Sequence, residues 1–180
     1  MSCKTVFLDR DGTINVDHGY VHRADQWQFD EGAIDALRLL SDAGYRIAVV
    51  TNQSGIAKGL YVEDDVIRLH KYVRERLSEA GAIVDAFAFC PHDEEGSCRC
   101  RKPRVGMLGQ VVDQLGEPVD LSASWTVGDK PSDIEFGHAL GMRTALLRSR
   151  YWRLDSLGLL PDLIVDSCYE AATKIASEGL

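Results

Sequence analysis

Residues 4–15 read KTVFLDRDGTIN, and this stretch decides the fold. Its apolar part, Thr5 to Leu8, predicts a short buried strand. Two carboxylates, Asp9 and Asp11, follow the strand on one small loop, with Gly12 directly behind them. Taken alone, a D-x-D-G-T segment can be a polar turn that caps the next element. The rest of the chain decides between that interpretation and a chemical site at the end of the strand.

Outward from this strand, apolar and amphipathic segments alternate along the whole chain. Further strands are predicted at 46–50 (running into 51–52), 84–89, 124–127, 143–147 and 163–165, and helices at 33–43, 62–80, 105–115 and 132–140. Strands that alternate with helices predict an α/β fold, with a parallel sheet covered by helices on both faces. The pattern shows no repeat and no linker, so we expect residues 1–180 to form a single domain.

Composition narrows the class of protein. The chain has 180 residues, of which 45% are hydrophobic and 27% charged, and its formal net charge is -8. An acidic chain argues against nucleic-acid binding, which normally needs a basic surface. No apolar run approaches the length of a membrane span, and the N-terminus lacks the pattern of a signal peptide. We therefore expect a cytoplasmic protein with no membrane partner, and a monomer.

Three polar motifs follow predicted strands and should meet, because the carboxyl ends of parallel strands share one edge of a sheet. They are Asp9-Arg10-Asp11, Thr51-Asn52-Gln53 and Gly128-Asp129-Lys130. A carboxylate at such an edge can attack a phosphoryl group if a cation offsets the negative charges. Asp9 and Asp129 offer the oxygen ligands that Mg²⁺ prefers. The recurrence of such polar residues at three strand ends favours phosphoryl chemistry over a simple turn.

Other residues of these motifs suit the same chemistry. A second acid, Asp11, can protonate the leaving oxygen and then deprotonate the attacking water. Gly12 lets the backbone turn closely around a phosphate. The Thr51 hydroxyl can donate to a phosphoryl oxygen, and a lysine can neutralise the charge that builds up there.

A second constellation lies in FCPHDEEGSCRCRKPRVG, residues 89–106. Its pattern C-x-H-x5-C-x-C supplies three thiolates and an imidazole, a complete tetrahedral set for a structural Zn²⁺ site: Cys90, His92, Cys98 and Cys100. The alternative is free cytosolic thiols beside a surface histidine, which the tight spacing disfavours. Arg101 and Lys102 follow directly, so a zinc-binding loop at about 90–102 would direct both cations toward a phosphate. The histidines outside this pattern are expected at the surface or against a sugar: His18, His22, His70 and His138.

Over nearly its whole length the chain resembles the haloacid dehalogenase superfamily of aspartate-nucleophile phosphatases. The first motif of that superfamily matches residues 9–13, the second Thr51, the third Lys102 and the fourth Asp129. The resemblance implies a three-layer Rossmann-like sheet of the haloacid dehalogenase type, and the chain leaves no room for an inserted cap domain. It also implies that Asp9 is the nucleophile that forms an aspartyl-phosphate. Asp11 would be the general acid/base, and its backbone carbonyl would bind Mg²⁺ with Asp9 and Asp129.

Two families of this superfamily share such a zinc loop. Several stretches resemble the D-glycero-D-manno-heptose 1,7-bisphosphate 7-phosphatases, namely FLDRDGTINVDHGYVH, VVTNQSGIAKG, CRKP, GMLG and VGDKPSDI. The five residues between His92 and Cys98 equal the usual loop length of the histidinol-phosphate phosphatases, which stay the alternative. A non-catalytic, zinc-stabilised phosphosugar-binding module is a further alternative, which the intact acids and lysine oppose.

The heptose interpretation implies a substrate and its contacts. The β anomer, used for lipopolysaccharide core through ADP-heptose, is favoured over the α anomer by its frequency in the family alone. The polar turn at residues 17–20 would contact the sugar, and Arg101 would hold the distal C1 phosphate. The expected substrate-binding residues are Arg10, Asp17, His18, Gly19, Tyr20, Asn52, Gln53, Ser54, Arg101 and Lys130.

Overall fold

Six parallel strands form the central sheet of this computed structural model, which describes residues 2–178. They are β1 (Thr5–Leu8), β2 (Arg46–Asn52), β3 (Ala86–Cys90), β4 (Trp125–Gly128), β5 (Arg143–Leu147) and β6 (Leu163–Val165). Their order across the sheet is β3-β2-β1-β4-β5-β6. β1 therefore lies at the centre, where Val6 pairs with Ile47 of β2 on one side and Trp125 of β4 on the other.

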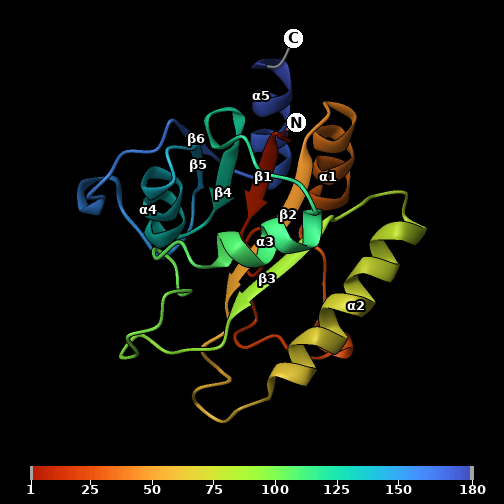
Figure 1. Cartoon of the computed structure of the whole chain (residues 1–180), viewed down its shortest axis with the longest axis vertical. Helices are drawn as coiled ribbons and strands as arrows, with labels where there is room; N and C mark the ends of the chain where they lie inside the picture. The colour runs from red at the N-terminus through yellow and green to blue at the C-terminus, as the bar shows by residue number, and fades with distance from the viewer. Residues whose placement is uncertain (1, 179–180) are drawn as a thin grey trace.

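Helices cover both faces of the sheet, as Figure 1 shows. They are α1 (Ala33–Asp42), α2 (Glu63–Glu79), α3 (Met107–Leu115), α4 (Pro131–Ala139) and α5 (Cys168–Glu178), and three short 3-10 turns occupy Ala24–Gln26, Leu121–Ala123 and Leu154–Ser156. α1, α2 and α5 contribute buried residues to one apolar cluster, and α3 and α4 contribute buried residues to the other. The fold is therefore a three-layer α/β sandwich.

The two apolar clusters follow from the alternation of side chains along a strand. In β1, Val6 and Leu8 join the cluster under α1, α2 and α5, while Phe7 joins the cluster under α3 and α4. All four residues of β1 are buried. A strand covered on both faces is largely apolar, which explains why Val6, Phe7 and Leu8 follow one another without polar alternation.

The predicted strands and helices are confirmed, with small shifts at their ends. The third strand runs to Cys90 instead of Phe89, and the third helix begins at Met107, not Val105. The segment between β1 and β2 contains a 3-10 turn and α1, and the segment between β2 and β3 contains α2. No cap domain is inserted in either segment. The sequence prediction lacked one helix, α5.

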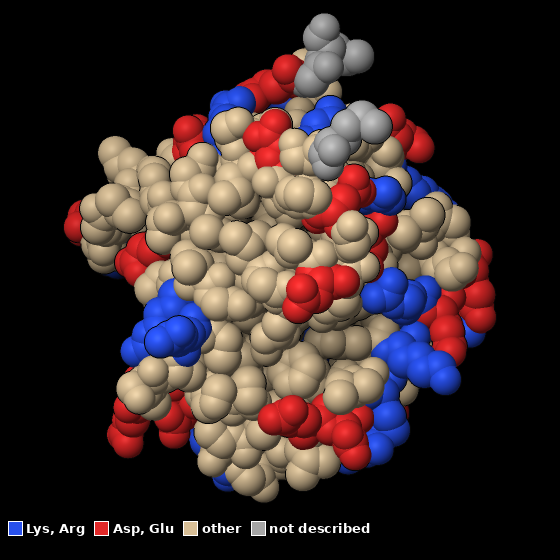
Figure 2. Space-filling model, viewed as in Figure 1, with Lys and Arg blue, Asp and Glu red and all other residues tan. Residues whose placement is uncertain are grey.

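The outer surface carries charges of both signs. On the face viewed in Figure 2, acidic and basic side chains are interspersed around a largely uncharged area over α3, without a continuous basic field. Between residues 2 and 178, no helix combines the length and the apolar character needed to cross a bilayer.

Candidate active site

The sheet order places the candidate site beside its central strand. After β1 the chain builds β2 and β3 on one side, and then returns to build β4 on the other. A crevice forms at such a reversal, outside the carboxyl ends of the two strands that flank it. Asp9 directly follows β1 and Asp129 directly follows β4. Both carboxylates are buried, at 5% and 2% exposure.

Lys102 is the buried cation that pairs with the carboxylates of the site. Its Nζ lies 2.8 Å from Asp9 Oδ1 and 2.6 Å from Asp133 Oδ1, and it donates to the Val50 carbonyl at 2.7 Å. Burial by itself lowers the pKa of Lys102, but the Asp133 and Asp9 carboxylates outweigh burial and raise it. The lysine is therefore a fixed cation that orients the Asp9 carboxylate.

The acids of the site fit a divalent cation. Asp9, Asp129 and Asp133 each place a carboxylate oxygen within 4.8 Å of the other two. Among the described residues, no donor hydrogen-bonds the buried Oδ1 of Asp129, and the Lys130 ammonium lies 3.4 Å from it. Burial and the neighbouring Asp9 raise the pKa of Asp129 to about 7. Three buried carboxylates beside two lysines leave room for another positive charge, which an oxygen-seeking ion such as Mg²⁺ would supply.

Gly12 lets the first loop reach Asp129. Its φ is +86°, and a Cβ built on it would lie 2.4 Å from Asp129 Oδ2. Any larger residue would therefore push against this carboxylate as well as strain the backbone.

Asp11 faces the same small cavity as Asp9 and is held by three donors. Arg10 Nη2 lies 2.9 Å from Asp11 Oδ2, Asn15 Nδ2 lies 2.9 Å from Oδ1, and Gln53 Nε2 lies 3.0 Å from Oδ2. Arg10 has no exposed surface, and it also donates to the Val21 carbonyl at 2.5 Å. Arg10 was expected to contact the substrate. In the structure its guanidinium is buried and hydrogen-bonds Asp11, so it orients that carboxylate.

His70 differs from the expectation for the histidines outside the zinc pattern. It was expected at the surface or against a sugar, and this prediction is wrong, because His70 is buried under β3. Its ring stacks on Phe87 at 4.6 Å and its Nε2 lies 3.3 Å from Arg10 Nη1. Burial lowers the pKa of His70 well below its usual range, so a neutral ring can accept from the arginine.

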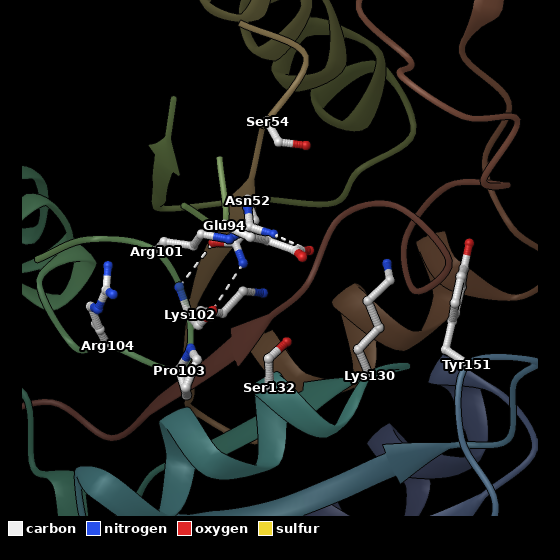
Figure 3. Close-up of a pocket in the computed structure, with 10 residues that line it drawn as sticks. All are labelled: Asn52, Ser54, Glu94, Arg101, Lys102, Pro103, Arg104, Lys130, Ser132 and Tyr151. Atoms are coloured by element: carbon white, nitrogen blue, oxygen red, sulfur yellow. Dashed lines mark hydrogen bonds and ion pairs between the residues drawn. The ribbon is translucent and has the colours of Figure 1, made fainter. Parts of the chain in front are cut away.

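A cavity of about 680 Å³ adjoins the carboxylates, and Figure 3 shows the side chains that line it. A much smaller recess of about 40 Å³ holds Asp9, Asp11, Thr51 and Lys102. The expected substrate residues Asn52, Ser54, Arg101 and Lys130 line the larger cavity. Lys130 lines both spaces, and although burial lowers its pKa, the Asp9 and Asp129 carboxylates raise it on balance.

The polar turn expected to contact a sugar is tied to the rim of the site. Asp17 Oδ2 accepts from the Tyr151 hydroxyl at 2.7 Å, and Tyr20 accepts from Lys58 Nζ at 2.7 Å. Asp17, Gly19 and Tyr20 line a further hollow of about 310 Å³ beside Gln53 and Ser54. His18 lies exposed on the same turn.

The four residues of the zinc pattern converge. His92 Nδ1 lies 3.4 Å from Cys90 Sγ and 3.3 Å from Cys100 Sγ, and one ligand atom from each of the four, Cys98 included, lies within 4.8 Å of the others. Burial raises the pKa of Cys98, but hydrogen bonds that include the Arg101 N–H outweigh it and lower the pKa to about 6. Burial raises the pKa of Cys90 and of Cys100, so it is the convergence of three sulfurs and an imidazole that suits a tetrahedral zinc ion.

Asp133 belongs to the site in the structure, although no role was predicted for it from the sequence. It sits in the first turn of α4, where its Oδ2 accepts from the Lys130 N–H at 3.0 Å and its Oδ1 binds Lys102. A Cβ on Gly128 would lie 2.1 Å from Asp133, so the strand end and the helix are in close contact. The signal in the sequence was an acid three residues after Lys130, a common helix-capping spacing.

Comparisons show which known proteins this chain is similar to. The HAD-hydrolase-like family matches residues 99–171. A D-glycero-beta-D-manno-heptose-1,7-bisphosphate 7-phosphatase of Yersinia pestis is 41% identical over 91% of this chain and 96% of its own length. The protein of that name from Escherichia coli K12 is 40% identical over 91% and 94%.

A solved structure is similar throughout. It is the D,D-heptose 1,7-bisphosphate phosphatase of B. bronchiseptica, complexed with magnesium and phosphate. Its TM-score is 0.85 at 31% identity, over 97% of this chain and 99% of that one.

Proposed function

Because this chain belongs to the D-glycero-β-D-manno-heptose-1,7-bisphosphate 7-phosphatase family of haloacid dehalogenase-like hydrolases, we propose that it removes the C7 phosphate of that bisphosphate. The product, a heptose 1-phosphate, would serve nucleotide-activated heptose synthesis for lipopolysaccharide core, in the cytoplasm. The observation that carries the proposal is one small recess holding Asp9, Asp11, Thr51 and Lys102. This recess has the nucleophile, acid, donor and cation that phosphate-ester hydrolysis needs.

The chemistry assigns nucleophilic attack to Asp9 and both proton transfers to Asp11. Asp9 attacks phosphorus, an O–P bond to Asp9 forms, and the bond to the sugar C7 oxygen breaks. Asp11 gives its proton to that leaving oxygen. Asp11 then takes a proton from water as the water attacks the aspartyl-phosphate, which releases inorganic phosphate and regenerates Asp9.

The charged groups around Asp9 would make this attack possible. Lys102 Nζ, 2.8 Å from Asp9 Oδ1, holds the nucleophile and offsets charge on the phosphoryl oxygens. Asp9, Asp129 and the Asp11 carbonyl would hold Mg²⁺, with Asp133 adjacent. The ion supplies electrostatic stabilisation of the transferring phosphoryl group.

Two further assignments belong to the proposal. A structural Zn²⁺ would bind Cys90, His92, Cys98 and Cys100 and fix the loop that carries Arg101 and Lys102. Arg101 and Lys130, which line the cavity beside the recess, would hold the distal C1 phosphate. The enzyme would act as a monomer on a small phosphosugar, without nucleic acid or membrane.

The decisive experiment compares kcat/KM, with Mg²⁺, for the β and α anomers of heptose 1,7-bisphosphate and for histidinol phosphate. We expect a clear preference for the β bisphosphate, the substrate in the names of the curated relatives. Preference for the α anomer would move the enzyme to a different heptose route. Preference for histidinol phosphate would contradict the proposal and favour the short loop between His92 and Cys98 as the better guide.

A further inference from the structure

The hydroxyl of Tyr61 contacts the site through a single side chain. Tyr61 lies between β2 and α2, is 5% exposed, and donates to Gln53 Oε1 at 2.7 Å. Gln53 is itself 2% exposed. Water therefore has little access to either end of this hydrogen bond, and the tyrosine is the group that satisfies the amide oxygen.

The opposite end of the Gln53 amide faces two groups of the recess. Its Nε2 donates to Asp11 Oδ2 at 3.0 Å and to Thr51 Oγ1 at 2.7 Å. In its ionised state, before it takes up the proton that it later gives to the leaving oxygen, Asp11 only accepts, so the amide nitrogen then faces Asp11 and the amide oxygen faces Tyr61. A flipped amide would put oxygen against oxygen at Asp11 and leave the Tyr61 hydroxyl without its acceptor.

This orientation determines what the Thr51 hydroxyl can do. Thr51 Oγ1 already accepts from Gln53, and no hydrogen bond within residues 2–178 uses the Thr51 hydroxyl as a donor. Its proton is therefore free to point into the recess that Thr51 shares with Asp9. The hydrogen bond from Gln53 uses one lone pair of Thr51 Oγ1 and fixes the oxygen, so the O–H remains available to donate, which is the role a phosphoryl oxygen requires.

The packing around Tyr61 keeps its hydroxyl in place. One face of the ring stacks on His22, with centroids 4.6 Å apart and planes 10° apart. A Cβ on Gly55 would lie 2.2 Å from Tyr61 Cε1, so the ring rests directly on that backbone. Burial raises the pKa of Tyr61 to about 12, and the hydroxyl stays a donor throughout the working pH range of an enzyme.

We propose that Tyr61 is a positioning residue for phosphoryl transfer: its hydroxyl orients Gln53, which commits the Thr51 hydroxyl to the phosphoryl group and holds Asp11. This inference rests on the proposed phosphatase function. It predicts that the Tyr61 hydroxyl, which need not touch the substrate, affects the rate of the chemical step. It should not affect the strength of substrate binding.

The first test is Tyr61→Phe, which keeps the ring and removes only the hydroxyl. We expect kcat on heptose 1,7-bisphosphate to fall about tenfold, since one donor to the phosphoryl group loses its direction, while KM stays within about twofold. Tyr45→Phe is the matched control, because Tyr45 is a mostly buried tyrosine at the amino end of β2. Its kcat should equal that of the wild type.

The second test separates positioning from a general structural effect. In a Gln53→Ala background, Tyr61→Phe should change kcat no further, because the hydroxyl acts only through Gln53. Gln53→Ala alone should lower kcat at least as much as Tyr61→Phe, and this variant also serves if Tyr61→Phe does not fold. An inactive wild type would refute the proposed function itself. An active wild type with unchanged kcat in Tyr61→Phe, or additive losses in the double variant, would overturn the role of Tyr61.

Discussion

The orientation and charge environment of the Asp9 carboxylate are set by its neighbours in the fold. Lys102 holds one of its oxygens, and Asp129 and Asp133 lie within reach of a shared cation. At this scale the effects of single side chains can be separated, because a substitution can remove one chemical property and keep the shape.

Asp9→Asn should abolish turnover and leave the fold intact. An amide cannot form the aspartyl-phosphate, whereas its size and its contact with Lys102 are nearly retained. We expect phosphate release to fall by about 10³-fold or more, and an acid-labile phospho-enzyme to be trapped only in the wild type. Asp155→Asn, at an exposed 3-10 turn, is the control. Residual activity near that of the wild type in a pure preparation would remove Asp9 from the role of nucleophile.

Gly12→Ala should weaken activation by Mg²⁺, because the new methyl group would press on Asp129 Oδ2. The concentration of Mg²⁺ at half-maximal activity should rise about tenfold or more. A tenfold rise corresponds to a loss of roughly 1.4 kcal/mol in the free energy of Mg²⁺ binding. Gly116→Ala is the matched control for backbone strain. Its φ of +69° is similarly positive, but a Cβ there meets no atom within 4 Å. Equal Mg²⁺ dependence in both variants would argue that the contact with Asp129 does not matter.

At the scale of elements, the zinc loop and α5 show two ways of stabilising a segment. The loop from β3 to α3 has few apolar contacts of its own beyond the cluster of Cys90, Cys98 and Cys100 with His92. A metal ion can replace a hydrophobic core in such a loop. α5, by contrast, is held by apolar burial against α1.

Cys98→Ser should lower both bound zinc and thermal stability. A serine hydroxyl is a far weaker zinc ligand than a thiolate, so zinc content should fall from about one ion per chain to a small fraction. The melting temperature should fall with it, as metal binding contributes to folding. Metal analysis and calorimetry measure the two quantities. Cys3→Ser, whose Sγ lies near Thr5 and outside the cluster, should keep its zinc; a zinc-replete Cys98→Ser would refute the ligand set.

Ile175→Ala should destabilise the fold without changing catalysis. Ile175 is fully buried in α5, and its truncation should reduce the free energy of unfolding by about 2–5 kcal/mol. Figure 1 shows α5 at the end of the molecule opposite the carboxyl ends of the strands, so kcat/KM should not change. Urea unfolding and steady-state kinetics test both statements. Lys174→Ala, exposed on the same helix, should change stability by about 0.5 kcal/mol or less.

The whole molecule forms the cavity where we expect the distal phosphate to bind. The end of β2 contributes Asn52 to its lining, and the segments after β3, β4 and β5 contribute Arg101, Lys130 and Tyr151, as Figure 3 shows. Arg101 is tied to this place by its contact with Glu94 at 3.0 Å and with the His92 carbonyl at 3.3 Å. Within residues 2–178 no cap domain is inserted, so we expect selectivity to come from such loop residues.

Arg101→Ala should raise KM for the bisphosphate about tenfold or more, the effect of losing a charge-assisted hydrogen bond of about 1.5–3 kcal/mol. Activity on a heptose 7-phosphate, which lacks the C1 phosphate, should not change. Arg99→Ala, an exposed arginine of the same loop, is the control. An equal loss on both substrates would assign Arg101 to the transferred phosphate or to loop stability instead.

The sequence alone predicted every strand, because each is an apolar run bounded by turn residues, and it predicted the carboxylates that follow β1 and β4. α5 escaped prediction since its buried side is mostly small: Cys168, Ala171, Ala172 and Ile175. Alanine and cysteine give a weak amphipathic pattern in the sequence. The helix is stabilised by its packing against α1, which the pattern does not show.

Local sequence could determine the acids, the zinc pattern and the strand that each motif follows, because these depend on residue type and spacing within short segments. Only the tertiary structure decided which groups share a hydrogen bond: Lys102 with Asp133, Arg10 with His70, and Tyr61 with Gln53. These partners come from different elements. Their pairing depends on burial and on the orientation of each donor and acceptor, and a one-dimensional pattern contains neither.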